Sequence, residues 1–199
     1  MYPGITAEGF ARVSQWPIGP DAEPLIASVR AGLHIDAPVN FRRHPRQMAP
    51  LIGCDLVAPA PVVDQVFVAG MDAGTADARE LLRVHHGAAH SLMCSLLDAA
   101  YRATYAAATL RRTQTLWLTL IGGGVFRNPI PLVAAAMARA HRRCLASLGP
   151  RKTTLKRVVI SLFPVNAAVD DFVAAFAAVG VTCKVTCVDS APKPEGGGR

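Results

Sequence analysis

Acidic residues are missing from a long central stretch of this 199-residue chain. No aspartate or glutamate occurs from Ala99 to Val169, whereas eleven lysine or arginine residues do. The rest of the chain carries 10 basic and 14 acidic residues, so the formal net charge of +7 arises entirely from this stretch. Such an asymmetry favours anionic ligands such as nucleotides, phosphates or nucleic acid, although a solvated basic face would give the same composition.

Long hydrophobic runs and signal-like segments are also missing. No apolar run reaches the roughly 18 to 20 residues of a membrane helix, so a membrane partner is not expected. The start, Met-Tyr-Pro-Gly-Ile, has no basic cap or apolar region of a secretory signal. We therefore expect a cytoplasmic protein, with the nucleus as the alternative. Five cysteines, an odd number, favour free thiols over a disulfide framework.

Hydrophobic residues make up 51% of the chain, which is enough for one domain with a proper core. Seven of the 15 prolines fall in the first 50 residues, so residues 1–50 are predicted to be irregular, with one short helix near Glu23 to Leu33. Residues 51–190 form the predicted domain, and residues 191–199 a disordered tail.

Strand-like and helix-like segments alternate within the predicted domain. This order predicts an α/β fold with three layers, α/β/α, and a mostly parallel central sheet whose strands are buried on both faces. Tyr101 and Trp117 are interpreted as core residues. The predicted strands are 62–69, 115–121, 155–163 and 181–188, and the predicted helices are 78–109 (interrupted near Gly87), 131–148 and 167–179.

Ligands in such sheets bind beyond the carboxyl ends of the strands, here the loops after Ala69, Ile121, Phe163 and Val188. The second of these loops reads Ile121-Gly-Gly-Gly-Val-Phe-Arg-Asn-Pro129, between a strand and a helix. Its glycines allow backbone N–H groups to approach a phosphate, the helix start favours an anion, and Arg127 adds a charged donor. A tight turn without a ligand is the alternative.

Two named phosphate motifs do not fit this loop. A Walker A loop ends in Gly-Lys-Ser/Thr, and the dinucleotide fingerprint needs a glycine where Arg127 stands and an acid about 20 residues further on. Instead, the strand, the loop and the alanine-rich helix resemble the macrodomain family. The preceding segment, Leu96-Leu-Asp-Ala-Ala-Tyr-Arg-Ala-Thr-Tyr105, resembles that family's leucine-x-x-tyrosine helix, and the resemblance extends over residues 57–188.

The resemblance implies binding of ADP-ribose or a related nucleotide diphosphate, with or without catalysis. It implies that backbone N–H groups of Gly122, Gly123, Gly124 and Val125 meet phosphate, that Phe126 lies against the distal ribose, and that the site extends through Arg127 and Asn128. Asn166 stands where the family has an adenosine contact, although a helix cap is equally expected there.

The chain departs from the family in its first half. The Asn-Ala-Ala-Asn segment and first glycine-rich loop have no counterpart, which removes the usual hydrolase residues. If the protein is nevertheless an ADP-ribosyl hydrolase, the acids from Asp72 to Glu80 and His85 are the first candidates for catalysis. Whether the protein is an enzyme is left open, and an interaction scaffold without a ligand is a further alternative.

The sequence offers residues for two other kinds of site, a nucleic-acid interface and a metal site. A nucleic-acid interface would use the cations Arg139, Arg142, Arg143, Arg151 and Lys152. His86, His90 and Cys94 follow one another at helical spacing, but about 12 Å of rise from the first to the last is too long for one ion to join all three. We therefore expect neither a metal nor a cofactor.

Overall fold

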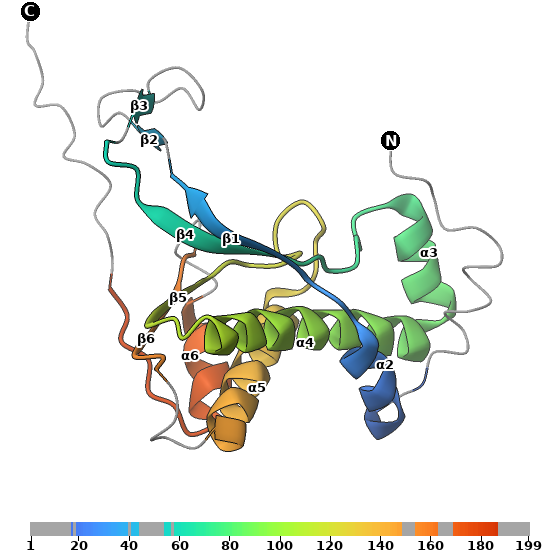
Figure 1. The fold of residues 1–199 in the computed structure, drawn as a ribbon. Coiled ribbons are helices and arrows are strands. Elements are labelled where there is room, and N and C mark those ends of the chain that lie inside the picture. The colour runs from blue at the N-terminus through green and yellow to red at the C-terminus, as the bar shows by residue number, and fades with distance from the viewer. Residues whose placement is uncertain are drawn as a thin grey trace, which may run out of the picture. The chain divides into compact units, whose positions relative to one another are not determined.

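The structure is a computed structural model. It divides into two compact units, one of Met1–Gly32 with Val66–Cys183 and one of Leu33–Gln65 with Lys184–Arg199, which are described separately. Figure 1 shows the elements of both. The structure describes residues Pro17, 19–39, 41–43, 54–56, 58–148, 154–162 and 169–186.

The core of the larger unit lies between three helices, α4 (His86–Leu110), α5 (Ile130–Leu148) and α6 (Val169–Ala177). Leu97 and Tyr101 of α4 are fully buried, as are Val133 and Met137 of α5. Alanines surround the α5 residues, and their small side chains allow the helices to pack closely. These three helices confirm the helices predicted at 78–109, 131–148 and 167–179, with shifts at their ends.

A parallel pair of strands packs on these helices. β5 (Thr115–Leu118) pairs in parallel with β6 (Arg157–Ile160), and α5 connects them. Leu116 and Leu118 are buried, and Val158 and Ile160 pack against the same core. A strand, a helix and a parallel strand in sequence form the βαβ unit that the alternation predicted.

The smaller unit contains antiparallel strands. β1 (Gly32–Pro38) pairs with β4 (Val62–Phe67), and β2 (Phe41–Arg43) pairs antiparallel with β3 (Cys54–Leu56). The Val39 N–H donates to the Pro61 carbonyl at 2.7 Å, and the Asp36 N–H donates to Asp64 Oδ1 at 2.9 Å. From Asp36 in β1 to Val39 just after it, the bonded residue goes back from Asp64 in β4 to Pro61 just before it, so the two strands run antiparallel.

Several predictions for these segments were wrong. The short helix α2 (Glu23–Ser28) ends five residues early, and β1 and β2 lie in the segment predicted to be irregular. Leu33, Ile35 and Ala37 alternate with polar residues, which is the strand signal that the many prolines obscured. Most of β4 is exposed rather than buried, in a sheet that has two strands among the described residues.

The predicted strand at 181–188 was also wrong over the residues described, since 181–186 form no ladder. The helix predicted at 78–109 is divided as expected, with the break at His85, where α3 (Ala76–Val84) ends, two residues before Gly87. The mixed α/β class is confirmed. In the part of the chain that the structure describes, each sheet has two strands and only β5–β6 is parallel. No helix of these residues is long and apolar enough to cross a membrane.

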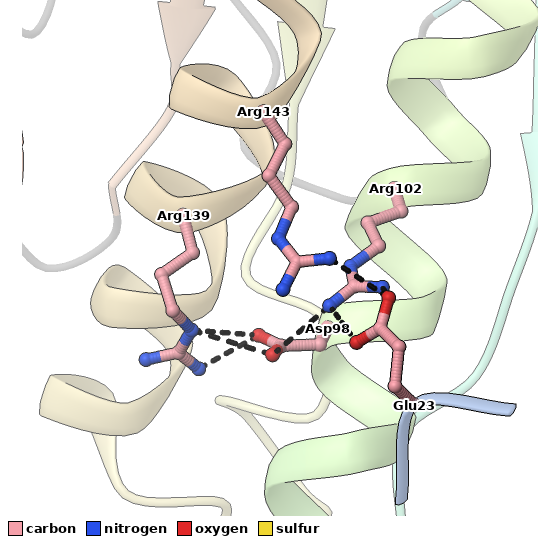
Figure 2. A network of polar contacts seen from close by, with 5 residues as sticks. All are labelled: Glu23, Asp98, Arg102, Arg139 and Arg143. Atoms are coloured by element: carbon pink, nitrogen blue, oxygen red, sulfur yellow. Dashed lines mark hydrogen bonds and ion pairs between the residues drawn. The ribbon is translucent and has the colours of Figure 1, made fainter. Parts of the chain in front are cut away.

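A network of charged side chains fastens α2 to α4 and α5 (Figure 2). Glu23 of α2 accepts hydrogen bonds from both terminal nitrogens of Arg102 and, at 2.8 Å, from Arg143. Arg139 donates to Asp98 Oδ1 at 2.7 Å, and Arg102 lies 3.9 Å from the other oxygen of Asp98. The hydrogen bonds from Arg102, and then from Arg143, lower the pKa of Glu23 from 4.5 to about 2.

Glu23→Gln tests the network. Because the folded-state pKa of Glu23 is depressed, its stabilisation is complete above about pH 4.5 and is lost as pH falls through about 2. Glu23 is 46% exposed, so screening reduces the expected loss at pH 7 to about 1 kcal/mol. Urea unfolding of both proteins between pH 7 and pH 2 should show this difference shrinking as the pH falls.

Glu80→Gln is the matched control, because Glu80 pairs with Arg83 within α3 and both side chains are well exposed. It should change the unfolding free energy less than Glu23→Gln does. Equal losses in the two variants, or a Glu23→Gln difference that is independent of pH, would contradict a role of Glu23 in holding α2.

Candidate functional site

The loops that follow β4 and β5 contact each other in the larger unit. The Ala73 N–H donates to the Phe126 carbonyl at 2.8 Å, and Asn128 Nδ2 donates to the Met71 carbonyl at 2.7 Å. Two of the four loops named as candidates for ligand binding, those after Ala69 and Ile121, therefore lie together. The loops predicted after Phe163 and Val188 lie outside the described residues.

Gly122 allows the second loop to fold back on itself. Its φ is +72°, and a Cβ placed on it would lie 2.1 Å from Asn128 Nδ2. No side chain fits at this distance, and the conformation itself disfavours residues other than glycine. Gly124 differs, because a Cβ there would meet no atom within 4 Å. Gly122 is therefore needed for the conformation of the loop, whereas Gly124 borders open space.

Asn128 joins the two loops. It is 2% exposed, and its side-chain amide donates to the carbonyls of Met71 and Gly122 while its own N–H donates to Gly122 at 2.9 Å. Its Oδ1 is buried and has no hydrogen-bond partner among the described residues. Buried acceptors in proteins are normally satisfied, so this oxygen is a place where water or a ligand donor would bind.

Tyr101 of α4 holds the start of the loop. Its hydroxyl donates to the Thr119 carbonyl at 2.8 Å and accepts the Ile121 N–H at 3.0 Å. Burial raises the pKa of Tyr101 far above its ordinary value, so the hydroxyl keeps the proton that it donates. The sequence correctly predicted that Tyr101 is buried, but the residue also fixes the point at which the strand becomes the loop.

The backbone of the loop leaves several donors unused. The N–H groups of Gly123, Arg127 and Asn128 donate within the loop, to Leu120, Gly124 and Gly122. In the part of the chain that the structure describes, no acceptor is found for the N–H groups of Gly122, Gly124, Val125 and Phe126. Gly124 and Val125 are exposed residues of the loop that leads into α5. Consecutive free amides in a loop, here at Gly124, Val125 and Phe126, can form an anion-binding arrangement.

The loop after β4 packs against the glycine-rich loop. The Gly74 N–H donates to Asp72 Oδ1 at 2.9 Å, and a Cβ on Gly74 would lie 2.9 Å from the Val125 carbonyl. The same Cβ would be 3.5 Å from Cδ of Arg127, so Asp72 and Arg127 both adjoin Gly74. Arg127 has a φ of +53°, the left-handed conformation that glycine adopts most easily.

The remaining predicted residues are placed as follows. Phe126 is half-buried, Val125 is almost fully exposed, and Asn166 lies outside the described residues. His86 and His90 stack with their ring centroids 6.0 Å apart, and Cys94 Sγ is 3.8 Å from His90 Nδ1. Among the described residues no group of three metal-ligating side chains is found.

The cations predicted to bind nucleic acid are only partly available. Arg139 and Arg143 are engaged by Asp98 and Glu23, Arg142 is exposed, and Arg151 and Lys152 lie outside the described residues. The prediction that Trp117 is a core residue was wrong, since it is 64% exposed on β5. Alternation along β5 places Leu116 and Leu118 inside and Trp117 on the opposite face.

Among the comparisons with known proteins, the one with solved structures finds a similarity. No family model matches the sequence, and no curated protein matches it either. Among solved structures, the chain is similar to poly(ADP-ribose) glycohydrolase from Deinococcus radiodurans in complex with ADP-ribose, with 20% identity and a TM-score of 0.49. The match covers 82% of this chain and 62% of that one, so the chain spans less than two thirds of that protein.

Gly122→Ala and Gly124→Ala test the geometry of the loop. The alanine Cβ at 122 would collide with Asn128 and would require a left-handed backbone, so we expect a loss of about 2 to 4 kcal/mol. At 124 the added methyl group enters open space, and a change within about 0.5 kcal/mol is expected. Thermal unfolding of both variants measures this contrast, and equal effects would show that the loop is folded differently.

Tyr101→Phe tests the anchor of the loop. Removing the hydroxyl takes one partner from the Ile121 N–H and one from the Thr119 carbonyl, which keep their mutual hydrogen bond at 2.9 Å, so the expected cost is about 0.5 to 1.5 kcal/mol. Tyr105→Phe is the matched control, because the Tyr105 hydroxyl meets His141 Nδ1 at 3.1 Å within the helical core. Hydrogen exchange at the loop amides should accelerate in the first variant alone, and acceleration in both or neither would refute the anchor.

Proposed function

We propose that this protein binds ADP-ribose or a related nucleotide diphosphate through the loop of residues 121–128. The observation that carries the proposal is the set of free N–H groups at Gly122, Gly124, Val125 and Phe126, in a loop fixed at one end by Tyr101 and at the other by Asn128. A diphosphate supplies several anionic oxygens at the spacing of neighbouring amides, which makes it a suitable partner for this backbone.

Electrostatics support an anionic ligand. The loop lies within the stretch from Ala99 to Val169 that contains no acidic residue, and the free amides precede the positive end of the α5 dipole. Arg127 is exposed beside them and can form a bidentate contact with phosphate. The Gly123 N–H is already bonded to Leu120, so this proposal gives Gly123 a packing role rather than a phosphate contact.

The finer features follow the macrodomain resemblance. We assign Phe126 to the distal ribose and Asn166 to the adenosine, within a three-layer α/β/α fold whose N-terminal part departs from the family. In this proposal the protein is a binding module of the cytoplasm that recognises the free nucleotide or an ADP-ribosylated protein.

Hydrolysis of an ADP-ribosyl bond is the second candidate, and one observation favours it. Of the acids from Asp72 to Glu80, Asp72 adjoins the glycine-rich loop through Gly74, whereas Glu80 is paired with Arg83 on α3. A carboxylate at the edge of a diphosphate site can act as a general base toward water. Loss of turnover in Asp72→Asn with unchanged ADP-ribose affinity would support this candidate. Absence of turnover in the unmodified protein would leave binding as the function.

Thermal unfolding with ADP-ribose, ADP and AMP tests the binding proposal. A ligand at one hundred times its dissociation constant stabilises by about 2.7 kcal/mol, which raises the Tm of a chain of this size by roughly 5 to 10 °C. Gly124→Glu should abolish this shift, because its carboxylate would occupy the open space before the amides without an internal collision. Gly123 is less suitable, since a Cβ there would lie 3.1 Å from Ile130 Cδ1.

Leu110→Glu is the matched control, since Leu110 is exposed at the end of α4 and the same charge is added outside the loop. It should keep the full ligand shift. The proposal fails if no nucleotide at millimolar concentration raises the Tm, or if Gly124→Glu responds as the unmodified protein does.

A further inference from the structure

One face of the β5–β6 pair is exposed and carries an aromatic side chain. The register pairs Thr115 with Arg157 and Trp117 with Val159, and these pairs alternate with the core pairs such as Leu116 with Val158. Trp117 is thereby directed away from the core and is 64% exposed. Parallel strands are normally covered on both faces, so an exposed tryptophan on such a pair indicates a binding surface.

Three cations, Arg112, Lys156 and Arg157, lie at or just before the amino ends of the same two strands. The N–H groups of Lys156 and Arg157 both donate to the Gln114 carbonyl, at 2.9 and 3.0 Å, which ties the start of β6 to the turn after α4. Arg112 stands in that turn, and all three cations are exposed. The segments that form this surface, 110–119 and 154–162, contain no acidic residue.

We infer that this surface, made by Arg112, Thr115, Trp117, Lys156 and Arg157, binds single-stranded nucleic acid. An exposed tryptophan on a sheet provides a stacking platform for a base, and neighbouring cations contact the phosphates that flank it. Charge complementarity selects a polyanion, and the aromatic platform selects unpaired bases over a duplex or an acidic protein. The surface uses the amino end of β5, whereas the glycine-rich loop follows its carboxyl end.

The interface differs from the one predicted on α5. There, Arg139 and Arg143 are held by Asp98 and Glu23, so their charges are partly neutralised within the protein. Arg142 is exposed on that helix and serves as a matched cation outside the proposed surface.

Tryptophan fluorescence provides the direct test. The chain has two tryptophans, so Trp16→Phe leaves Trp117 as the single reporter. We expect a 12-nucleotide oligodeoxythymidine to quench Trp117 on binding, and an abasic oligomer of the same length to bind more weakly without quenching. Equal binding of the abasic oligomer or of a DNA duplex would overturn base stacking. Protection of Trp117 from acrylamide before any oligomer is added would overturn the surface itself.

Variants separate the two contributions in the full chain. Trp117→Ala should weaken binding by about 5- to 150-fold, and Trp117→Phe should retain much of the affinity. Lys156→Ala and Arg157→Ala should each reduce the slope of log affinity against log salt by about 0.7, whereas Arg142→Ala should leave it unchanged. Unchanged affinity in Trp117→Ala, or an equal effect of Arg142→Ala, would refute the assignment.

Gly124→Glu distinguishes this inference from the proposed function. The variant should lose the stabilisation by ADP-ribose and keep the affinity for the oligomer. Loss of both in this variant would overturn a separate nucleic-acid surface, whereas failure of ADP-ribose to bind the unmodified protein would affect the proposed function alone.

Discussion

The close approach of Asn128 to Gly122 is the contact on which the site depends. A side chain at 122 would occupy the place of the Asn128 amide, which donates both to the Gly122 carbonyl and to Met71 in the neighbouring loop. The turn that results uses three of the loop's own N–H groups and leaves four without an acceptor among the described residues. Tyr101 fixes the other end of the loop from α4, so the free amides are held in place before any ligand arrives.

The packing of α5 against α4 and α2 supports the position of the loop. Small residues on α5 allow it to lie against α4, and the charged network of Glu23, Arg102 and Arg143 adds α2 to the same pair of helices. Because α5 begins directly after the loop, any shift of this helix would move the amides. The exposed face of β5 lies outside that core, which is why a second, separate surface can be proposed on the same strand.

The sequence allowed the glycine-rich loop, its place between a strand and a helix, and the main helices to be predicted, because glycines and helical periodicity are local signals. The role of Tyr101 and the contact of Gly74 with the Val125 carbonyl were not predicted, since they depend on residues distant in sequence. The exposure of Trp117 was missed because a short apolar strand does not show which of its faces is covered. β1 was missed because frequent prolines obscured its alternation.

The most direct test of the account is a titration of ¹⁵N-labelled protein with ADP-ribose, followed by amide chemical shifts. The account predicts that the resonances of Gly122, Gly124, Val125 and Phe126 move together and saturate, because these N–H groups exchange water for phosphate oxygen. The Gly123 amide, already bonded to Leu120, should move less. Shifts confined to residues outside the loop, or no saturable shift at millimolar ligand, would contradict the claim that these free amides are the binding site.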